Sequence, residues 1–277
     1  MYQLSNLEIH AWHGCNLTCE SCSHFSSLGL RSGPTAEECD RWMRPWASRL
    51  KPQVFSIVGG EPTLNKQLAE IVYCAGITWP ESIIRLVTNG FLLPKHPQLI
   101  GVLSDLSDRA VLEISSHHNS PQYQARFEGI RQLANQWKES HHIDIRIIDA
   151  TQRWTRRYIS VGSSVEFIGS NPRIAWEICE GKSCKQIFRG NLWKCPPIAY
   201  FSLLRGKSVV SKHSSELAES YVALTPGCSD LELRQFLAKE DESVCQLCPS
   251  NLEFFDLPNP LTPPAKRTRT TEPNRSI

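Results

Sequence analysis

Three cysteines near the amino terminus have the spacing of a metal-binding loop. Residues 13–25 read HGCNLTCESCSHF, which places Cys15, Cys19 and Cys22 in a C-x3-C-x2-C pattern. A closed zinc site needs four ligands, whereas an iron–sulfur cubane bound by three thiolates keeps one iron open for a further ligand. The pattern therefore predicts a catalytic iron–sulfur cluster. The alternative is a zinc site with a distant fourth ligand.

Glycine, carboxylate and small polar residues follow several apolar runs. Gly59-Gly60-Glu61-Pro62 comes directly after one such run, and Thr88-Asn89-Gly90 comes after the next. Glycine lets the backbone approach a ligand closely, and barrel enzymes keep their sites at the carboxyl ends of their strands. His117 and His118 are expected to be exposed loop histidines, and Asp149 ends the fifth run. Ser115 and Ser116 end the fourth run.

The elements that must position these residues alternate in type along the first ~170 residues. Short β-branched runs that stop at polar or glycine residues are typical of buried parallel strands, and stretches with helical spacing lie between them. This alternation predicts an α/β fold, either barrel-like or doubly wound. We expect strands at 7–12, 54–58, 83–87, 111–115 and 143–148, and helices at 35–50, 64–75, 122–137 and 229–239.

The second half of the chain carries another group of cysteines. The run at residues 188–194, FRGNLWK, alternates around a glycine and predicts a hairpin that would bring Cys184 and Cys195 together. Such a group can close a tetrahedral zinc site or hold a cubane, and the spacing alone leaves both open. Cys39 and Cys74 lie within expected helices, and we assign them no function. The second group comprises Cys179, Cys184, Cys195, Cys228, Cys245 and Cys248.

Composition divides the chain into three parts. Residues 1–171 show the strand–helix alternation, residues 172–256 hold six of the eleven cysteines, and residues 257–277 contain five prolines without apolar periodicity. We therefore expect a core domain, a small cysteine-rich module and a disordered tail. With 40% hydrophobic and 21% charged residues, the composition excludes collagen, coiled coil and wholesale disorder.

Charge and targeting signals narrow the class of protein. The net charge of +2 comes from basic residues of the tail, so the rest of the chain lacks the basic excess of nucleic-acid-binding proteins. No apolar stretch approaches the roughly 20 residues of a membrane span, and the first ten residues show no secretory signal. An odd number of cysteines without an export signal indicates metal or redox chemistry in the cytoplasm. We expect neither nucleic acid nor membrane as a partner.

The cysteine spacing, its place after the first strand and the following GGEP sequence resemble the radical S-adenosylmethionine (SAM) superfamily. The resemblance implies a partial (β/α)6 TIM-like barrel in which Cys15, Cys19 and Cys22 hold a [4Fe-4S] cluster. It also implies that the open iron binds SAM, and that reductive cleavage of SAM yields a 5′-deoxyadenosyl radical. A flavodoxin- or ferredoxin-type protein would supply the electron. The implied SAM contacts are Gly59, Gly60, Glu61, Thr88, Asn89, Ser115 and Ser116.

The cysteine loop departs from the family pattern at one position. In the family the residue before the third cysteine is often aromatic and lies near the adenine, whereas this chain has Ser21. We expect Phe25 or Trp12 to supply that contact, or the contact to be missing.

The second cysteine group resembles the auxiliary-cluster modules called SPASM and Twitch. A full SPASM module holds two clusters and has a closely spaced run of four cysteines, which this chain lacks, so the resemblance implies one auxiliary [4Fe-4S] cluster. Cys195, Cys245 and Cys248 are expected to bind it, and Cys179 and Cys184 compete for the remaining position unless both bind and one of the others is released. Cys228 lies outside the set. Zinc stays the alternative. The candidate ligands are Cys179, Cys184, Cys195, Cys245 and Cys248.

The resemblances together imply a radical SAM enzyme that abstracts a substrate hydrogen, for oxidation or another C–H modification. Relatives with such modules modify ribosomal peptides or oxidise sugars and aminocyclitols. No peptide-recognition domain is visible before the first strand, which favours a small or carbohydrate-like substrate. The alternatives are a ribosomal-peptide (RiPP) maturase and, from another class, a non-catalytic zinc-stabilised binding protein. No residue is assigned a catalytic role.

Overall fold

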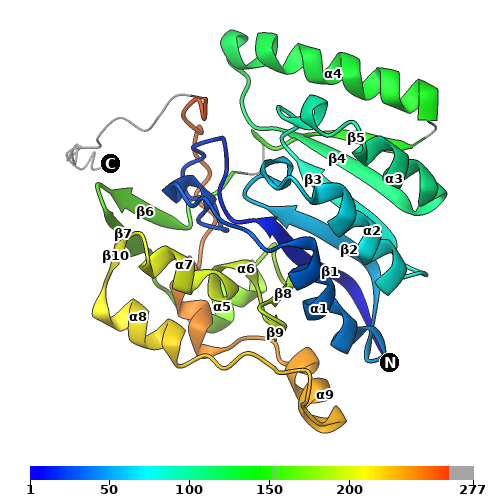
Figure 1. The fold of residues 1–277 in the computed structure, drawn as a ribbon. Coiled ribbons are helices and arrows are strands. Elements are labelled where there is room, and N and C mark those ends of the chain that lie inside the picture. The colour runs from blue at the N-terminus through cyan, green and yellow to red at the C-terminus, as the bar shows by residue number, and fades with distance from the viewer. Residues whose placement is uncertain (142, 152–153, 262–277) are drawn as a thin grey trace.

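A seven-stranded sheet forms the centre of the protein (Figure 1). The computed structural model describes residues 1–141, 143–151 and 154–261. The strand order is β5-β4-β3-β2-β1-β8-β9, in which all neighbours from β5 to β8 are parallel and β9 returns antiparallel to β8. The strands are β1 (Tyr2–Trp12), β2 (Leu50–Gly59), β3 (Ile83–Thr88), β4 (Ala110–Ser116), β5 (Asp144–Asp149), β8 (Lys185–Phe188) and β9 (Asn191–Trp193).

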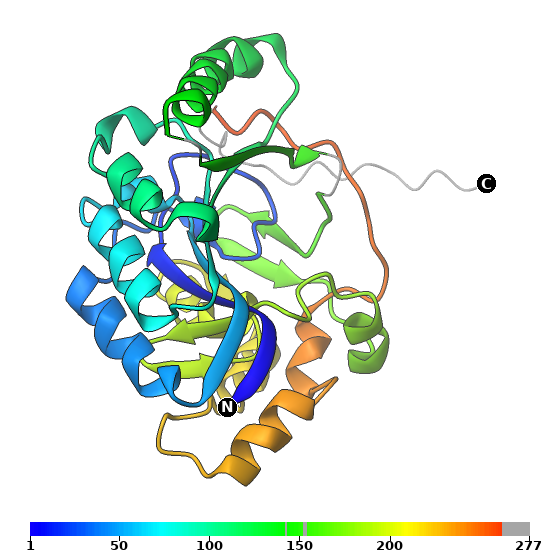
Figure 2. The same cartoon turned by 90° about the vertical axis from the view of Figure 1, so that its right-hand side faces the viewer.

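Four helices cover the outer side of this sheet. Figure 2 shows them in an arc outside the strands. Six parallel strands with helices on the outside confirm the predicted partial (β/α)6 TIM-like barrel. The first four strands are each followed by a covering helix, whereas β5 and β8 lead into further strands. The helices are α1 (Ala36–Ala47), α2 (Leu68–Thr78), α3 (Leu99–Asp105) and α4 (Pro121–His141).

Local sequence explains where these elements begin and what they bury. Residues 6–11 of β1 are all buried, because a parallel strand is covered on both faces. Helix α1 begins after Thr35, whose hydroxyl accepts a hydrogen bond from the Glu38 N–H while the Glu38 carboxylate accepts one from the Thr35 N–H. The helix ends at Ala47, earlier than the predicted residue 50, because Leu50 already begins β2.

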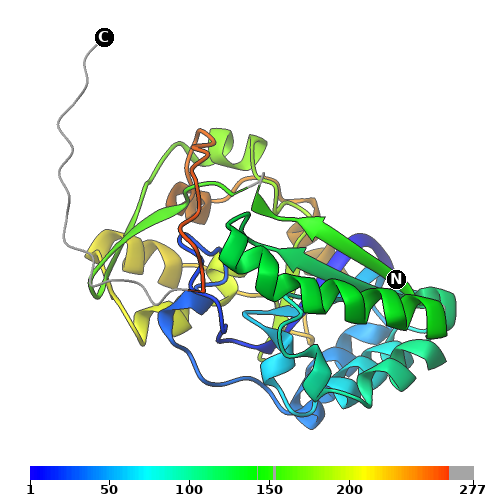
Figure 3. The same cartoon turned by 90° about the horizontal axis from the view of Figure 1, so that it is seen from above.

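The second half of the chain extends the same scaffold. Strand β8 pairs with β1, and a second sheet, β10-β7-β6, lies on the opposite side of the molecule from α2 and α3 (Figure 3). Both sheets therefore combine strands from the two sides of the predicted 171/172 boundary. The remaining elements are β6 (Tyr158–Val161), β7 (Ser164–Phe167), α5 (Pro172–Glu177), α6 (Pro196–Ala199), α7 (Phe201–Arg205), β10 (Val209–Val210), α8 (Lys212–Glu219) and α9 (Asp230–Ala238).

The described part of the predicted tail packs against the protein. Leu257 is buried, and the Pro260 carbonyl accepts hydrogen bonds from the Thr18 N–H (2.9 Å) and hydroxyl (3.0 Å). The tail prediction therefore starts too early, because residues 257–261 cover the cysteine loop. Residues 262–277 lie outside the described residues. No described helix is long and apolar enough to cross a membrane.

The predicted hairpin is present as β8 and β9. Its turn consists of Arg189 (φ 52°) and Gly190 (φ 78°), both in the left-handed region that matches the twist of a two-residue hairpin. A Cβ on Gly190 would meet only Trp42 Cδ1, at 3.7 Å, so the backbone angle rather than space requires glycine there. The turn is anchored from the other side, because Trp46 Nε1 donates to the Gly190 carbonyl at 2.9 Å.

We expect Gly190→Ala to lower the free energy of unfolding by about 1 kcal/mol, since an L-residue is strained in this conformation. Urea denaturation of the apo protein measures the change. Gly101→Ala is the matched control: Gly101 lies in α3 without a positive φ or a close neighbour, and we expect it to stabilise by up to about 1 kcal/mol. Equal effects of the two substitutions would contradict this account of the turn.

Candidate metal centres

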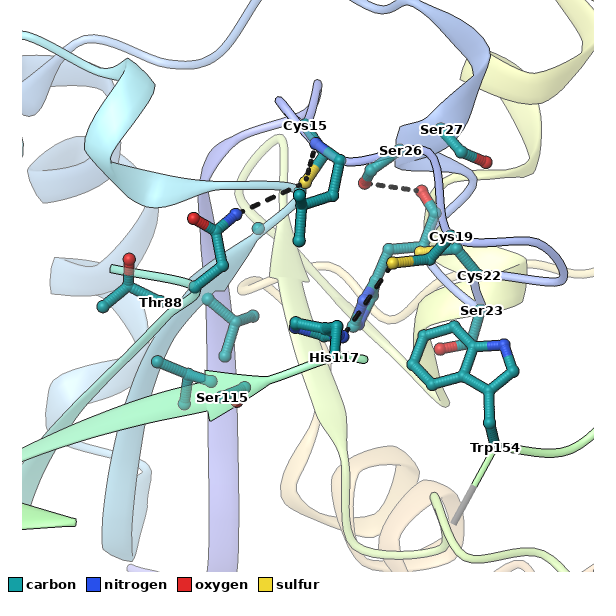
Figure 4. Close-up of a pocket in the computed structure, with 17 residues that line it drawn as sticks. Cys15, Cys19, Cys22, Ser23, Ser26, Ser27, Thr88, Ser115, His117 and Trp154 are labelled. Atoms are coloured by element: carbon teal, nitrogen blue, oxygen red, sulfur yellow. Dashed lines mark hydrogen bonds between the residues drawn. The ribbon is translucent and has the colours of Figure 1, made fainter. Parts of the chain in front are cut away.

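Cys15, Cys19 and Cys22 line one cavity at the carboxyl ends of the central strands. The cavity has a volume of about 230 Å³ and lies between the loop after β1 and the ends of β2, β3 and β4. Figure 4 shows the three sulfur atoms around this space. Its lining includes no fourth cysteine. The donor set fits a [4Fe-4S] cluster with one open iron, because three thiolates bind three of the four irons.

Among the described residues, no group of three His, Cys, Asp or Glu side chains is gathered in a way that could hold a single metal ion. A cubane makes a different demand, since each thiolate binds a different iron of the cluster. A cubane therefore does not require the three thiols to meet at one metal ion.

The cysteine loop is fastened to β6 by Ser21. Its hydroxyl accepts hydrogen bonds from the N–H groups of Arg157 (2.6 Å) and Tyr158 (3.1 Å), and the Tyr158 hydroxyl donates to the Cys22 carbonyl (3.0 Å). Ser21 itself has a φ of 58°. Phe25 packs against Tyr158 instead of facing the cavity. At the position where an aromatic residue is often found, Ser21 therefore holds the cysteine loop against β6.

The aromatic side chain that lines the cavity is Trp154, which was not among the residues expected from the sequence. Trp154 lines the cavity, whereas neither Phe25 nor Trp12 does. Its Nε1 donates to the Glu20 carbonyl at 2.6 Å, and its ring packs edge-on against His117. Trp154 is distant in sequence from the cysteines, and no local spacing signals it.

Gly60 brings the end of β2 against the cysteine loop. The Gly60 N–H donates to the Trp12 carbonyl and the Glu61 N–H donates to the Gly14 carbonyl, both at 2.8 Å. A Cβ on Gly60 would lie 2.1 Å from the Gly14 oxygen, which no side chain can accept. Gly59 and Gly60 both line the cavity.

Glu61 has a role different from the one expected. Its side chain is fully buried and does not line the cavity. The carboxylate accepts hydrogen bonds from the Thr88 hydroxyl (2.5 Å), the Asn89 N–H (2.8 Å), and the N–H and hydroxyl of Thr63. Burial raises the pKa of Glu61, and these donors oppose that rise. The carboxylate thus joins the ends of β2 and β3.

Asn89 continues this connection to the cysteine loop. Its Nδ2 donates to Asn16 Oδ1 at 2.7 Å and lies 3.8 Å from the Cys15 sulfur. Thr88 and Asn89 both line the cavity, as expected from their place after β3. The end of β3 is therefore tied to Glu61 on one side and to the first cysteine on the other.

The end of β4 contributes one serine and one histidine. Ser115 lines the cavity, whereas Ser116 does not and instead accepts a hydrogen bond from Gln124 Nε2. His117, expected to be an exposed loop residue, lines the cavity with Nδ1 3.9 Å from the Cys19 sulfur (Figure 4). Burial lowers the pKa of His117 to about 4, so its imidazole is neutral at pH 7. The expectation is wrong because β4 turns His117 inward.

Two other polar candidates lie outside the cavity. His118 Nδ1 accepts a hydrogen bond from the Ser120 N–H and has a role in the turn before α4. Asp149 accepts hydrogen bonds from the N–H and hydroxyl of Thr151. Neither side chain lines the cavity.

The three thiols differ in their electrostatic surroundings. Burial raises the pKa of Cys15 and of Cys19, and the Glu61 carboxylate raises that of Cys15 further. Burial also acts to raise the pKa of Cys22, but a hydrogen bond and charge interaction with His24 outweigh it and lower the pKa. Cys22 is therefore the thiol most ready to bind metal as a thiolate.

Four cysteines of the second group line one small cavity. Cys179 follows α5, Cys195 directly precedes α6, and Cys245 and Cys248 lie in and after the 3-10 turn Ser243–Leu247. Burial raises the pKa of the thiols of Cys195 and Cys248, whose neighbours include the other cysteines of the set. Four thiols around one space fit a closed cluster site.

Cys184 and Cys228 do not line this cavity. Cys184 lies beside the Glu8 carboxyl of β1, although the predicted hairpin is present. Cys228 accepts a hydrogen bond from Arg49 Nη1 at 3.1 Å. Of the two cysteines expected to compete for one ligand position, only Cys179 is placed with Cys195.

The chain was compared with protein families, curated proteins and solved structures. No family model matches the chain. A segment of 69 residues is 38% identical to the "Probable GTP 3',8-cyclase" of Pyrococcus horikoshii, and this match covers 25% of the chain and 22% of that protein. The chain thus matches about a fifth of the length of this curated relative.

Two solved structures also resemble the chain. Streptococcus suis SuiB bound to S-adenosylmethionine has a TM-score of 0.42 and 20% identity over 52% of this chain and 33% of that one. BtrN in complex with AdoMet and 2-DOIA has a TM-score of 0.46 and 16% identity over 87% and 97% of the two chains.

Three cysteines converge beside the GGEP segment, and part of the chain matches a curated relative. Both findings support the assignment of the chain to the radical SAM superfamily. The resemblance to that superfamily is thereby confirmed. The SPASM/Twitch resemblance of the second half remains a prediction.

We expect Glu61→Gln to lower the free energy of unfolding of the apo protein by about 2 kcal/mol, since hydrogen bonds to a charged acceptor contribute about that much each and an amide N–H₂ would face donors. Chemical denaturation measures the loss. Glu81→Gln is the control, because Glu81 is exposed and should change stability by less than about 0.5 kcal/mol. A Glu61→Gln protein as stable as this control would refute the joining role of Glu61.

Proposed function

We propose that the protein is a radical SAM enzyme that reductively cleaves SAM and abstracts a hydrogen atom from a small or carbohydrate-like substrate. The observation that carries the proposal is the convergence of Cys15, Cys19 and Cys22 on one cavity without a fourth cysteine. When bound, the cluster and SAM supply a one-electron cleavage that yields the 5′-deoxyadenosyl radical. The protein supplies binding, orientation and exclusion of water.

We assign SAM to the same cavity. The backbone of Gly59 and Gly60 is open to a ligand there, and the Thr88, Asn89 and Ser115 side chains offer hydrogen bonds. Trp154 takes the place of the missing aromatic residue as an apolar wall for the adenine, opposite the ends of the strands. Glu61 and Ser116 act from outside the cavity, through Thr88, Asn89 and α4.

The lining of the cavity favours a neutral, polar substrate. Among the described lining residues none is Lys, Arg, Asp or Glu, whereas hydroxyls are frequent. SAM would bring its own charged groups to the open iron, but a charged group of the substrate would find no countercharge among these side chains, and buried charges without a partner are costly. Hydroxyl groups of a carbohydrate-like molecule would find donors and acceptors. The serines that line the cavity are Ser23, Ser26, Ser27 and Ser115.

We propose a second [4Fe-4S] cluster bound by Cys179, Cys195, Cys245 and Cys248, as in a Twitch-like module. The shared cavity of these four thiols supports this set, and the place of Cys184 beside Glu8 argues against the alternative. A second cluster can accept an electron from a substrate radical, which favours an oxidative outcome. A flavodoxin- or ferredoxin-type protein would reduce the first cluster.

The first test is anaerobic reconstitution followed by measurement of iron, sulfide and 5′-deoxyadenosine. We expect a brown protein that forms 5′-deoxyadenosine with a reductant, a Cys15→Ala variant that forms none above background, and a Cys245→Ala variant that keeps uncoupled cleavage. A colourless, zinc-containing protein without SAM cleavage would instead support the binding-protein alternative. SAM cleavage that requires an added peptide would support the RiPP maturase.

The second test compares two neighbouring cysteines. We expect Cys184→Ser to keep about eight irons per chain, and Cys179→Ser to fall to about four, because only Cys179 belongs to the second cluster. Iron quantitation and the visible spectrum measure the difference. Loss of iron from Cys184→Ser with retention in Cys179→Ser would reverse the ligand assignment.

A further inference from the structure

The ammonium group of Lys194 is buried beside the second group of cysteines. Lys194 is 8% exposed and lines the same cavity as the four thiols. Its Nζ donates to the carbonyl oxygens of Lys239 (3.5 Å) and Glu240. Within the described residues, no carboxylate oxygen lies within 4.0 Å of it. The charge is therefore met only by neutral dipoles.

Two more lysines surround this region. Lys182 lines the same cavity, and its Nζ donates to the Glu177 carbonyl at 2.7 Å and lies 4.5 Å from the centre of the Trp176 ring. Lys185 donates to the Lys182 carbonyl at 3.1 Å. In the part of the chain that the structure describes, neither has a carboxylate partner within 4.0 Å.

The nearby carboxylates pair with other cations. Glu242 pairs with Lys239 at 3.2 Å through Oε1, while its Oε2 is buried without a hydrogen-bond partner among the described residues. Glu177 and Glu240 both pair with Arg173. None of them lies within 4.0 Å of the Nζ of Lys182, Lys185 or Lys194, so these lysines outnumber the one carboxylate, Glu242, that keeps an unpaired oxygen in the described part of this region.

Burying an unpaired cation is costly, and an anion in the same cavity offsets the cost. A cubane with four thiolate ligands is anionic, and it gains another negative charge on reduction. The net charge around an iron–sulfur cluster is one of the factors that set its reduction potential. Cations near this centre therefore favour its reduced form.

The first cavity has the opposite character. Its described lining contains neither lysine nor arginine. The Glu61 carboxylate lies just outside this cavity, where it accepts a hydrogen bond from the Asn89 N–H at 2.8 Å. The described lining of the first cavity therefore lacks the cations that line the second.

We propose that Lys194, together with Lys182 and Lys185, compensates the negative charge of the second cluster and raises its reduction potential above that of the first. The inference rests on the proposed function, because it needs a cluster on Cys179, Cys195, Cys245 and Cys248. It assigns the lysines an electrostatic role, distinct from ligand binding.

The test uses the full chain with Cys15, Cys19 and Cys22 replaced by alanine, so that only the second centre can bind iron. A redox titration followed by electron paramagnetic resonance measures its midpoint potential. We expect Lys194→Met to lower the ratio of reduced to oxidised cluster at a fixed potential at least tenfold, which is a shift of 59 mV for one electron. Lys194→Arg keeps the charge, and its ratio of reduced to oxidised cluster should stay within about threefold, which is a shift of at most about 28 mV.

Lys212→Met is the matched control, since Lys212 is 89% exposed on α8 and should not change the potential. If Lys194→Met binds no cluster, Lys182→Met and Lys185→Met decide: lowered potentials support the proposal, and unchanged ones overturn it. An unchanged potential in Lys194→Met, or an equal fall in Lys194→Arg, overturns it while leaving the second cluster in place. Absence of iron from the parent variant refutes the second cluster itself.

Discussion

The buried carboxylate of Glu61 is the contact on which the first centre depends. It accepts hydrogen bonds from Thr63, Thr88 and Asn89, and thereby joins the ends of two parallel strands that have no covalent connection at this edge. The Asn89 side chain in turn donates a hydrogen bond to Asn16, which is next to the first cysteine. Burial of a charge is unfavourable without hydrogen-bond partners. The Glu61 carboxylate is therefore stable only while the three residues donate to it, and the same hydrogen bonds hold the two strand ends together.

The pairing of β8 with β1 places both cysteine groups on one scaffold. Inside the barrel, Gln186 of β8 donates to the Glu8 carboxylate of β1 and accepts from the Tyr200 hydroxyl at 2.8 Å. The Tyr200 ring stacks on His10, with centroids 3.7 Å apart. Burial lowers the pKa of His10, so a neutral imidazole fills this space. The hydrogen bonds of Gln186 with Glu8 and Tyr200 favour one arrangement of the two halves.

The two centres differ in the charges that surround them. Among the described residues, no Lys, Arg, Asp or Glu lines the first cavity, and the Glu61 carboxylate lies outside it. Lys182 and Lys194 line the second cavity. The cysteines of both groups are buried or partly buried, and burial raises the pKa of the Cys15, Cys19, Cys195 and Cys248 thiols. Metal binding offsets this cost, because a bound thiolate shares its charge with iron.

Hydrophobic periodicity and ligand spacing are local properties, and they were enough to predict strands β1 to β5, helices α1, α2 and α4, and the grouping of Cys15, Cys19 and Cys22. They did not predict α3 or the place of β8 in the barrel sheet. The tertiary structure sets which residues meet across strands. It turned His117 inward, brought Trp154 to the cavity, withdrew Glu61 from it, and placed Cys179 rather than Cys184 with the second group. These outcomes depend on side-chain direction at strand ends and on pairing between segments far apart in sequence, which no local pattern encodes.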